Sequence, residues 1–185
     1  MKILAFTGMP CSGKSVAVQI AKEKNFLVLR MGDEVWHETK NQGLPLNDKN
    51  VGFVANEMRK KHGKDIWAKK TLEKINLNVD EDVIVIDGLR NSEEVDFFKK
   101  NLGNNFIIIA ILASDELRKK RVIERKRADD STDIKDLEIR DKRELSWGLG
   151  DVIYNADIKI LNEGSIDEFI DKINKILQNQ CKTIN

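Results

Sequence analysis

Short apolar runs recur along the chain and predict buried strands. The first covers residues 3–7, and others follow at residues 26–29, 83–86 and 106–112, with a weaker one at residues 158–161. These runs are rich in β-branched residues and almost free of charge, as interior strands covered on both faces need to be. The pattern therefore favours a parallel sheet.

Between these runs, apolar residues return at helical spacing. One such pattern follows a glycine-rich segment and ends near Asn25, and another begins at Ser165 and Glu168, which form a capping box. Strands that alternate with helices imply right-handed βαβ units. We therefore expect an α/β fold in which a five-stranded parallel sheet is flanked by helices, within a single domain.

Two segments interrupt the alternation. Residues 34–80 carry helical patterns at 51–62 and 65–75 but no convincing strand, which predicts a helical insertion between the second and third strands. Residues 117–146 are almost entirely charged and also helical. The core is then expected at about residues 1–33, 81–116 and 147–185.

Composition narrows the class of protein. The 185 residues hold 32 Lys+Arg against 31 Asp+Glu, a formal net charge of +1, which argues against a polybasic nucleic-acid binder but leaves a local patch open. Cys11 and Cys181 fit neither a zinc spacing nor a disulfide framework. No apolar run reaches the roughly 18 residues of a membrane span, and the first run is too short for a signal peptide. We expect a cytoplasmic protein without a membrane partner.

The glycine-rich segment after the first strand matches the pattern G-x-x-x-x-G-K-[ST] at every fixed position. It consists of Gly8, Met9, Pro10, Cys11, Ser12, Gly13, Lys14 and Ser15. Glycines let the backbone curl into a nest of N–H donors around phosphate oxygens, and the following helix adds its positive end. Lys14 is expected at the β- and γ-phosphates of ATP, and the Ser15 hydroxyl is expected on Mg²⁺. Because the motif stands between a predicted strand and a predicted helix, a chance glycine turn is the weaker interpretation.

The motif alone leaves the reaction open. GTPases usually carry an N/T-K-x-D motif, which this sequence lacks. Large motor or transport ATPases need a longer chain. A small kinase is therefore the economical interpretation.

Asp87 ends the third apolar run, and Arg90 follows three residues later. The carboxyl ends of parallel strands meet at the ligand crevice, where the glycine-rich loop also lies. Asp87 can therefore hold Mg²⁺ there, usually through its water shell, although an Asp-Gly pair can also simply form a turn. The guanidinium of Arg90 can fork onto an acceptor phosphate.

Residues 118–127 hold seven basic side chains and one acidic side chain. Arg118, Arg121 and Arg125 are spaced to share one face of a helix. The run is equally consistent with a solvated charged helix and with a lid whose arginines neutralise charge during phosphoryl transfer. An RNA-binding patch is a third interpretation.

Several segments together resemble the nucleoside monophosphate kinases, and in particular a largely archaeal family of small adenylate-kinase-related P-loop proteins, also labelled dephospho-CoA-kinase-like. The likeness covers nearly the whole chain. The segments that carry it are Gly8–Ser15, Met31–Asp33, Ile86–Arg90, Arg125–Asp130, Arg140–Leu145, Trp147–Gly150 and Asn155–Asp157.

This resemblance implies a P-loop NTPase fold with an acceptor-binding insertion at about residues 34–80 and an arginine-rich lid at about 117–146. It places Asp33 and Arg90 at the acceptor nucleotide. Adenylate kinases carry an arginine where this chain has Trp36, so the acceptor can differ from AMP. The arginines that would face the transferring phosphoryl group are Arg121, Arg125 and Arg127, joined by Arg140 or Arg143.

The leading hypothesis is a phosphotransferase that uses ATP and Mg²⁺ and moves the γ-phosphoryl group to AMP or a related nucleotide-like small molecule. In it Lys14, Asp87 and the lid arginines are catalytic. One alternative is a nucleotide-binding regulatory module without turnover. Another is a kinase or processing factor acting on RNA ends, which the near-neutral net charge disfavours. The sequence leaves the oligomeric state and the choice between ATP and GTP open.

Overall fold

The five apolar runs form one parallel sheet, as the sequence predicts. The strand order is β2-β3-β1-β4-β5, so the first strand of the chain lies at the centre of the sheet. The computed structural model describes residues 1–124 and 134–182. The strands are β1 (Lys2–Thr7), β2 (Leu27–Arg30), β3 (Val83–Asp87), β4 (Phe106–Leu112) and β5 (Ile158–Leu161).

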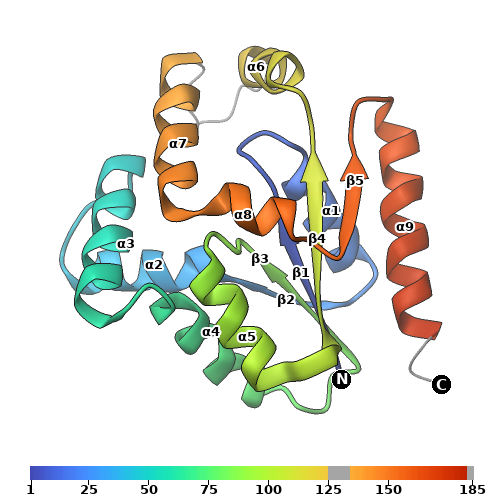
Figure 1. Cartoon of the computed structure of the whole chain (residues 1–185), viewed down its shortest axis with the longest axis horizontal. Helices are drawn as coiled ribbons and strands as arrows, with labels where there is room; N and C mark the ends of the chain where they lie inside the picture. Colours follow the sequence, from blue (N-terminus) through green and yellow to red (C-terminus); the bar gives the residue numbers. More distant parts are fainter. Residues whose placement is uncertain (125–133, 183–185) are drawn as a thin grey trace.

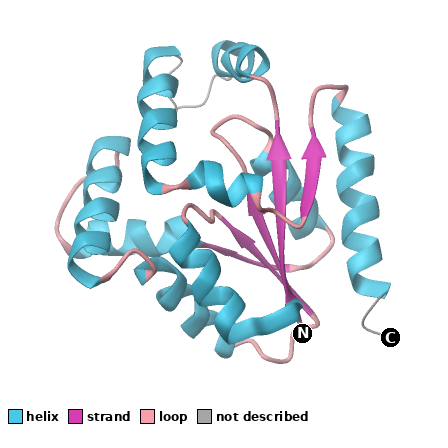
Figure 2. Ribbon diagram, viewed as in Figure 1, coloured by secondary structure: helices cyan, strands magenta, loops and turns pink. Residues whose placement is uncertain are grey.

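Helices connect the strands and cover both faces of the sheet (Figures 1 and 2). In the described residues they are α1 (Lys14–Glu23), α2 (Met31–Asn41), α3 (Asp48–His62), α4 (Ile66–Asn76), α5 (Ser92–Leu102), α6 (Asp115–Glu124), α7 (Ile134–Trp147), α8 (Leu149–Tyr154) and α9 (Ile166–Lys182), with a 3₁₀ turn at Gly103–Asn105. None of these helices combines the length and the apolar character needed to cross a membrane.

Alternate side chains of the strands pack on opposite faces of the sheet, which divides the core in two. On one face, Ile84 and Ile86 join Trp67 of α4 and Phe98 of α5. On the other face, the apolar strand residues Leu4, Phe6, Val85, Ile109 and Ile111 join α1 and α9. Fully burying one large apolar side chain stabilises the fold by about 1.5–3 kcal/mol relative to its exposure. Both clusters therefore hold the sheet rigid beneath its carboxyl edge.

The strand register brings three polar residues together at that edge. Arg30, the last residue of β2, is paired with Asp87, the last residue of β3, and Asp87 is paired in turn with Phe6 of β1. Thr7 follows Phe6, and its hydroxyl donates to the carbonyl of Leu89 at 3.0 Å. The end of β1 is thereby tied to the loop that carries Arg90.

The structure also contains helices that the apolar pattern does not predict. α2 begins at Met31, directly after β2, and has the narrow buried stripe Met31, Val35 and Thr39. α5 is capped by Asn91, whose side chain accepts from the amide of Glu94 at 2.7 Å. The buried apolar side chains are Met31 and Val35 in α2, and Val95 and Phe98 in α5. The predicted helix at 51–62 begins earlier, at Asp48, because the side chain of the preceding asparagine caps its first turn.

Candidate functional site

The glycine-rich loop, residues 8–15, joins β1 to α1. Its φ angle is 150° at Gly8 and 110° at Gly13, values that residues with a side chain rarely adopt. A Cβ at Gly8 would lie 2.5 Å from the carbonyl oxygen of Ile111, so the loop needs glycine there. α1 then begins at Lys14, and no side chain in the described part of the chain caps its first turn. The first amides of α1 can therefore meet an anion.

Side chains from outside the loop hold its carbonyl oxygens. The pairs are Arg118 to Pro10 (3.0 Å), Arg121 to Cys11 (3.3 Å) and Ser12 (3.0 Å), and Asn162 to Ser12 (2.8 Å). A peptide group is planar and trans, so its N–H points away from its C=O. The amides of this stretch consequently face away from the three donors, and that of Ser12 closes a turn onto the Met9 carbonyl at 3.1 Å. The loop is fixed from behind, on the side opposite a phosphate.

Lys14 and Asp87 lie together where the loop meets the edge of the sheet. Lys14 Nζ is 3.3 Å from Asp87 Oδ1, and Arg30 Nε is 3.7 Å from Asp87 Oδ2. Arg30 Nη1 is also 3.6 Å from Asp33 Oδ1, and the guanidinium lies 5.3 Å from the centre of the Trp36 ring. Arg30 therefore joins the predicted metal carboxylate to the predicted acceptor carboxylate.

The oxygen atoms at this point suit Mg²⁺. Asp87 Oδ1 is buried and, apart from its ion pair, has no hydrogen-bond partner among the described residues. The Ser15 hydroxyl follows Lys14 in the same loop, and oxygen ligands of both kinds are those that Mg²⁺ takes. No group of three or more His, Cys, Asp or Glu side chains placed to hold a metal occurs in residues 1–124 and 134–182. Mg²⁺ does not need such a group, because water and substrate phosphates usually complete its shell.

A buried carboxylate holds two of the predicted arginines. Glu144 of α7 is 2% exposed, forms an ion pair with Arg90 and accepts from Arg140 Nε at 3.1 Å. Burial by itself would raise the pKa of Glu144, but the charges of Arg90, Arg140 and Lys14 outweigh it and hold this pKa below its ordinary value. Glu144 is therefore an anion at neutral pH, and it aligns guanidiniums beside the loop lysine.

The same helix is fastened to α3. Arg143 forks onto Asp48 at 2.7 and 2.9 Å, and this hydrogen bonding lowers the pKa of Asp48 against the effect of burial. The indole N–H of Trp147 donates to Asn56 at 2.6 Å, and the guanidinium of Arg59 lies 4.5 Å from the centre of the Trp147 ring. These contacts join α7 to the helical segment predicted to bind the acceptor.

The charged run at 118–127 does not behave as one solvated face. Arg118 is only 3% exposed, so the solvated-face interpretation is wrong for this residue. The side chain of its neighbour Lys119 is 44% exposed and forms a surface ion pair. Arg125 and Arg127 lie outside the described residues, and their place at a transferring phosphoryl group stays a prediction.

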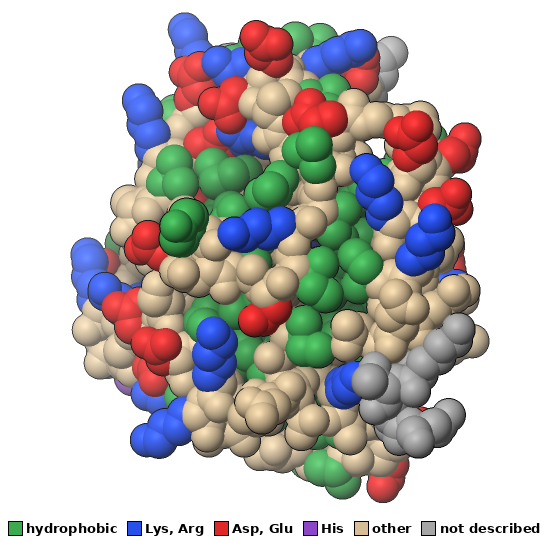
Figure 3. Space-filling model, turned by 45° about the vertical axis from the view of Figure 1, so that its right-hand side comes forward, with side chains coloured by type: hydrophobic (Ala, Val, Ile, Leu, Met, Phe, Trp, Pro, Cys, Tyr) green, Lys and Arg blue, Asp and Glu red, His purple; other side chains and the backbone are tan. Residues whose placement is uncertain are grey.

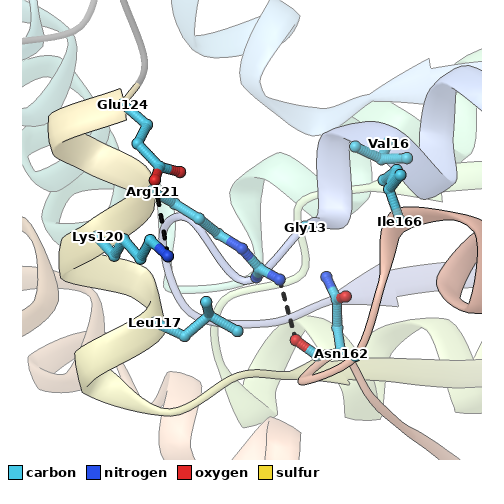
Figure 4. A pocket seen from close by; sticks show the side chains of 9 residues that line it. Gly13, Val16, Leu117, Lys120, Arg121, Glu124, Asn162 and Ile166 are labelled. Atoms are coloured by element: carbon cyan, nitrogen blue, oxygen red, sulfur yellow. Dashed lines mark hydrogen bonds and ion pairs between the residues drawn. The ribbon is translucent and has the colours of Figure 1, made fainter.

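A cavity of about 370 Å³ opens between the loop, α6 and the segment after β5. Figure 4 shows Arg121 reaching across it to the carbonyl of Asn162, to which it donates at 3.0 Å. The lining is Gly13, Val16, Leu117, Lys120, Arg121, Glu124, Asn162, Gly164 and Ile166. Charged, polar and apolar side chains line it together, and its volume falls within the range of small-molecule sites. The structure thus places Arg121 against the loop carbonyls and this cavity.

Sequence reasoning did not identify Arg30, Asn162, Glu144 or Asp141 as site residues; Asp141 of α7 accepts two hydrogen bonds from Arg118. Arg30 ends β2 and Asn162 follows β5. The strand-end rule that selects Asp87 would have selected both. Glu144 and Asp141 stand in a helix full of charges, where nothing in the spacing distinguishes a buried carboxylate from an exposed one.

Comparison with known proteins identifies the family of this chain. Residues 7–138 match the AAA_17 family model, described as an AAA domain. A UPF0200/UPF0201 protein from Archaeoglobus fulgidus is 44% identical over all 185 residues, and the chain spans 57% of that protein's length. A UPF0200 protein from Methanosarcina barkeri is 43% identical over 182 residues, which cover 98% of this chain and 97% of the relative.

Solved structures with low sequence identity share the fold. The protein TT1252 from Thermus thermophilus has a TM-score of 0.66 at 14% identity, with 96% of this chain and 97% of that one covered. Shikimate kinase from Aquifex aeolicus has a TM-score of 0.51 at 20% identity, with 95% and 96% covered. The five-stranded sheet and its loop are therefore those of a P-loop NTPase-like kinase fold. The chain belongs to the UPF0200 family and carries an AAA_17 domain.

Proposed function

We propose that the protein is a nucleotide-kinase-like phosphotransferase that moves the γ-phosphoryl group of ATP to AMP or a related nucleotide-like acceptor. One observation carries the proposal: a phosphate-binding loop with its lysine stands beside two arginines that a buried glutamate aligns. A single anion-binding loop would serve a nucleotide sensor equally well. The arginines of a second anion site beside the loop favour transfer between two anionic substrates.

The donor half of the site is the loop and the adjoining cavity. Loop amides and the N-terminal end of α1 would hold the ATP phosphates, with Lys14 at the β- and γ-phosphates. The base would enter the cavity beside Arg121 and Asn162, whose volume of about 370 Å³ accommodates it. Ser15 and Asp87 would hold Mg²⁺, which neutralises charge on the phosphates when bound.

The acceptor half would be formed by Asp33, Arg90 and the C-terminal half of α7. Arg90 and Arg140 are the cations for an acceptor phosphate, and Glu144 keeps them in place. Holding two substrates in line can supply about 7–11 kcal/mol of the barrier. One well-placed arginine can supply a further factor of about 10³–10⁵ in rate, because the transition state is loose and highly anionic. Helices α6 and α7 would act as the lid that excludes water.

The alternative of an RNA-end factor has less support. Figure 3 shows acidic and basic side chains interspersed over the charged top of the visible face. Within α6 and α7, Arg118, Lys119 and Arg143 each pair with a carboxylate, which reduces the local positive charge. A phosphate backbone requires unneutralised cations in a row.

The test is phosphorus NMR of the purified protein with Mg–ATP and one acceptor at a time: AMP, CMP, UMP, GMP, dephospho-CoA or a 5′-hydroxyl RNA. Lys14→Ala is the blank for contaminating kinases, and Lys22→Ala, a basic change in the same helix but away from the loop, is the matched control. We expect a new phosphorylated product with wild type and Lys22→Ala but not with Lys14→Ala. Binding of ATP without transfer to any acceptor would instead support the regulatory module.

A further inference from the structure

Arg118 is a buried charged side chain, and its burial costs free energy unless hydrogen-bond acceptors compensate it. Its guanidinium is on α6, yet only 3% of the residue is exposed. It donates to both oxygens of Asp141 on α7, at 2.9 and 2.6 Å, and to the exposed Asp115 at 2.7 Å. It also donates to the carbonyl of Pro10 at 3.0 Å. A guanidinium is buried only when such acceptors compensate its lost hydration.

These contacts connect three parts of the protein. The bond to Pro10 fixes the back of the phosphate-binding loop, while the fork onto Asp141 fixes the middle of α7. Asp141 directly follows Arg140 and stands one helical turn before Glu144, both of which belong to the acceptor half of the site. The planar guanidinium fixes direction as well as distance, because two parallel N–H bonds to one carboxylate define an orientation.

An exposed ion pair between the same two helices can be compared with the buried pair of Arg118 and Asp141. Lys119, the next residue along α6, also pairs with a carboxylate of α7, Glu138, at 3.1 Å. Both side chains of that pair are about half exposed, and such pairs contribute little. These two ion pairs link the same two helices, and the buried one of the two also contacts the loop.

We propose that Arg118 is a positioning residue that couples the donor loop to the acceptor half through Asp141. The proposal rests on the proposed function, since it concerns how the two halves of that site communicate. Donor phosphates that fix the loop also fix the position of the Pro10 carbonyl. Arg118, which is bonded to this carbonyl and to Asp141, then restricts the motion of α7. Arg140 and Glu144 are then held ready for the acceptor while the donor is bound. Breaking the fork to Asp141 should leave the donor site intact and disconnect α7 from it.

The test is hydrogen–deuterium exchange of the whole protein with and without Mg–ADP, read at the amides of residues 134–147. Asp141→Asn removes the charge that Arg118 meets on α7, while Asp115 and Pro10 still engage the guanidinium. Asp115→Asn removes the other carboxylate partner without touching α7, and Glu138→Gln removes the surface pair. Mg–ADP affinity is measured for every variant by calorimetry.

We expect Mg–ADP to slow exchange in α7 by about fivefold or more in wild type, Asp115→Asn and Glu138→Gln, the lower end of typical coupling between sites. Asp141→Asn should bind Mg–ADP about as well but show no such slowing. If this variant fails to fold, Asp141→Glu, which keeps the charge at a shifted distance, should show a reduced effect. In the transfer assay, Asp141→Asn should raise the KM for the acceptor and lower kcat with little change in the KM for ATP.

Equal slowing in Asp141→Asn, or in Asp141→Glu where that variant is used, and in wild type would overturn the proposal. The proposal would also be overturned if Asp115→Asn abolished the slowing of exchange in α7 as fully as Asp141→Asn does. The effect would then depend on the number of carboxylates paired with Arg118 and not on its bond to α7. Mg–ADP binding to wild type without any change in α7 would overturn the coupling alone. Absence of Mg–ADP binding would overturn the proposed function, and the coupling with it.

Discussion

Replacing Glu144 by glutamine removes one buried charge while keeping the shape of the side chain. In the folded protein this carboxylate is 2% exposed and contacts Arg90 and Arg140. Removing one partner of a fully buried ion pair costs about 3–5 kcal/mol. The Arg90 and Arg140 side chains are 22% and 38% exposed, so water compensates part of the loss. We expect Glu144→Gln to reduce the free energy of unfolding by about 2–3 kcal/mol at pH 7.

The effect should depend on pH in a defined direction. The pKa of Glu144 lies below its ordinary value of 4.5 in the folded state. The ion pairs therefore contribute fully above about pH 4.5, and their contribution is lost as pH falls through the folded pKa. Below that point wild type carries a neutral side chain, like the glutamine variant. The difference between the two proteins should consequently shrink in acid.

Urea unfolding at pH 7 and at lower pH values measures this difference. In a domain of this size the loss corresponds to a fall in Tm of roughly 4–12 °C. Glu138→Gln, on the same helix but in an exposed pair, is the matched control and should change stability by less than about 1 kcal/mol. Equal stability of wild type and Glu144→Gln at pH 7 would refute the reasoning, as would a loss that persists unchanged in acid.

Three further changes give independent checks. Gly13→Ala should lower the free energy of unfolding in urea more than Gly43→Ala does. Both positions have positive φ, but of the two only a Cβ at Gly13 would overlap Asn162, so equal losses of stability would contradict this reasoning. Trp147→Phe keeps the ring but loses the indole N–H that donates to α3, and should cost about 1 kcal/mol in thermal unfolding. Arg121→Ala should weaken Mg–ATP binding in calorimetry by tenfold or more. The change removes the hydrogen bonds that Arg121 donates to two loop carbonyls, and it removes the side chain that forms the edge of the cavity. Unchanged affinity would place the base of ATP outside this cavity.

The strands and the loop could be predicted from the sequence because their signals are local. Each strand is a continuous apolar run, and the glycine-rich motif places its chemistry in eight consecutive residues. The predicted strand bounds agree with the structure to within one residue at either end. The meeting of Lys14 and Asp87 was also foreseeable, because carboxyl ends of adjacent parallel strands share an edge.

The rest of the site depends on tertiary contacts that spacing does not encode. Arg118 and Lys119 are neighbours with similar charge, yet one is buried against Asp141 and the other is half solvated. Which of them faces inward depends on how α7 packs on α6. Likewise, Glu144 differs from Glu138 because it is buried against Arg90, which the β3–α5 loop brings to it. The helices α2 and α5 were not predicted individually, although each has a buried face with two apolar side chains.

The central position of β1 has a consequence for the nascent chain. β1 is translated before its neighbours, but its partners β3 and β4 begin only at Val83 and Phe106. Until those residues leave the ribosome, β1 has two unpaired edges, which are templates for association with other chains. We therefore expect ribosome stalling before Phe106 to yield aggregation-prone chains, and stalling after the helical segments that follow β4 to yield compact ones.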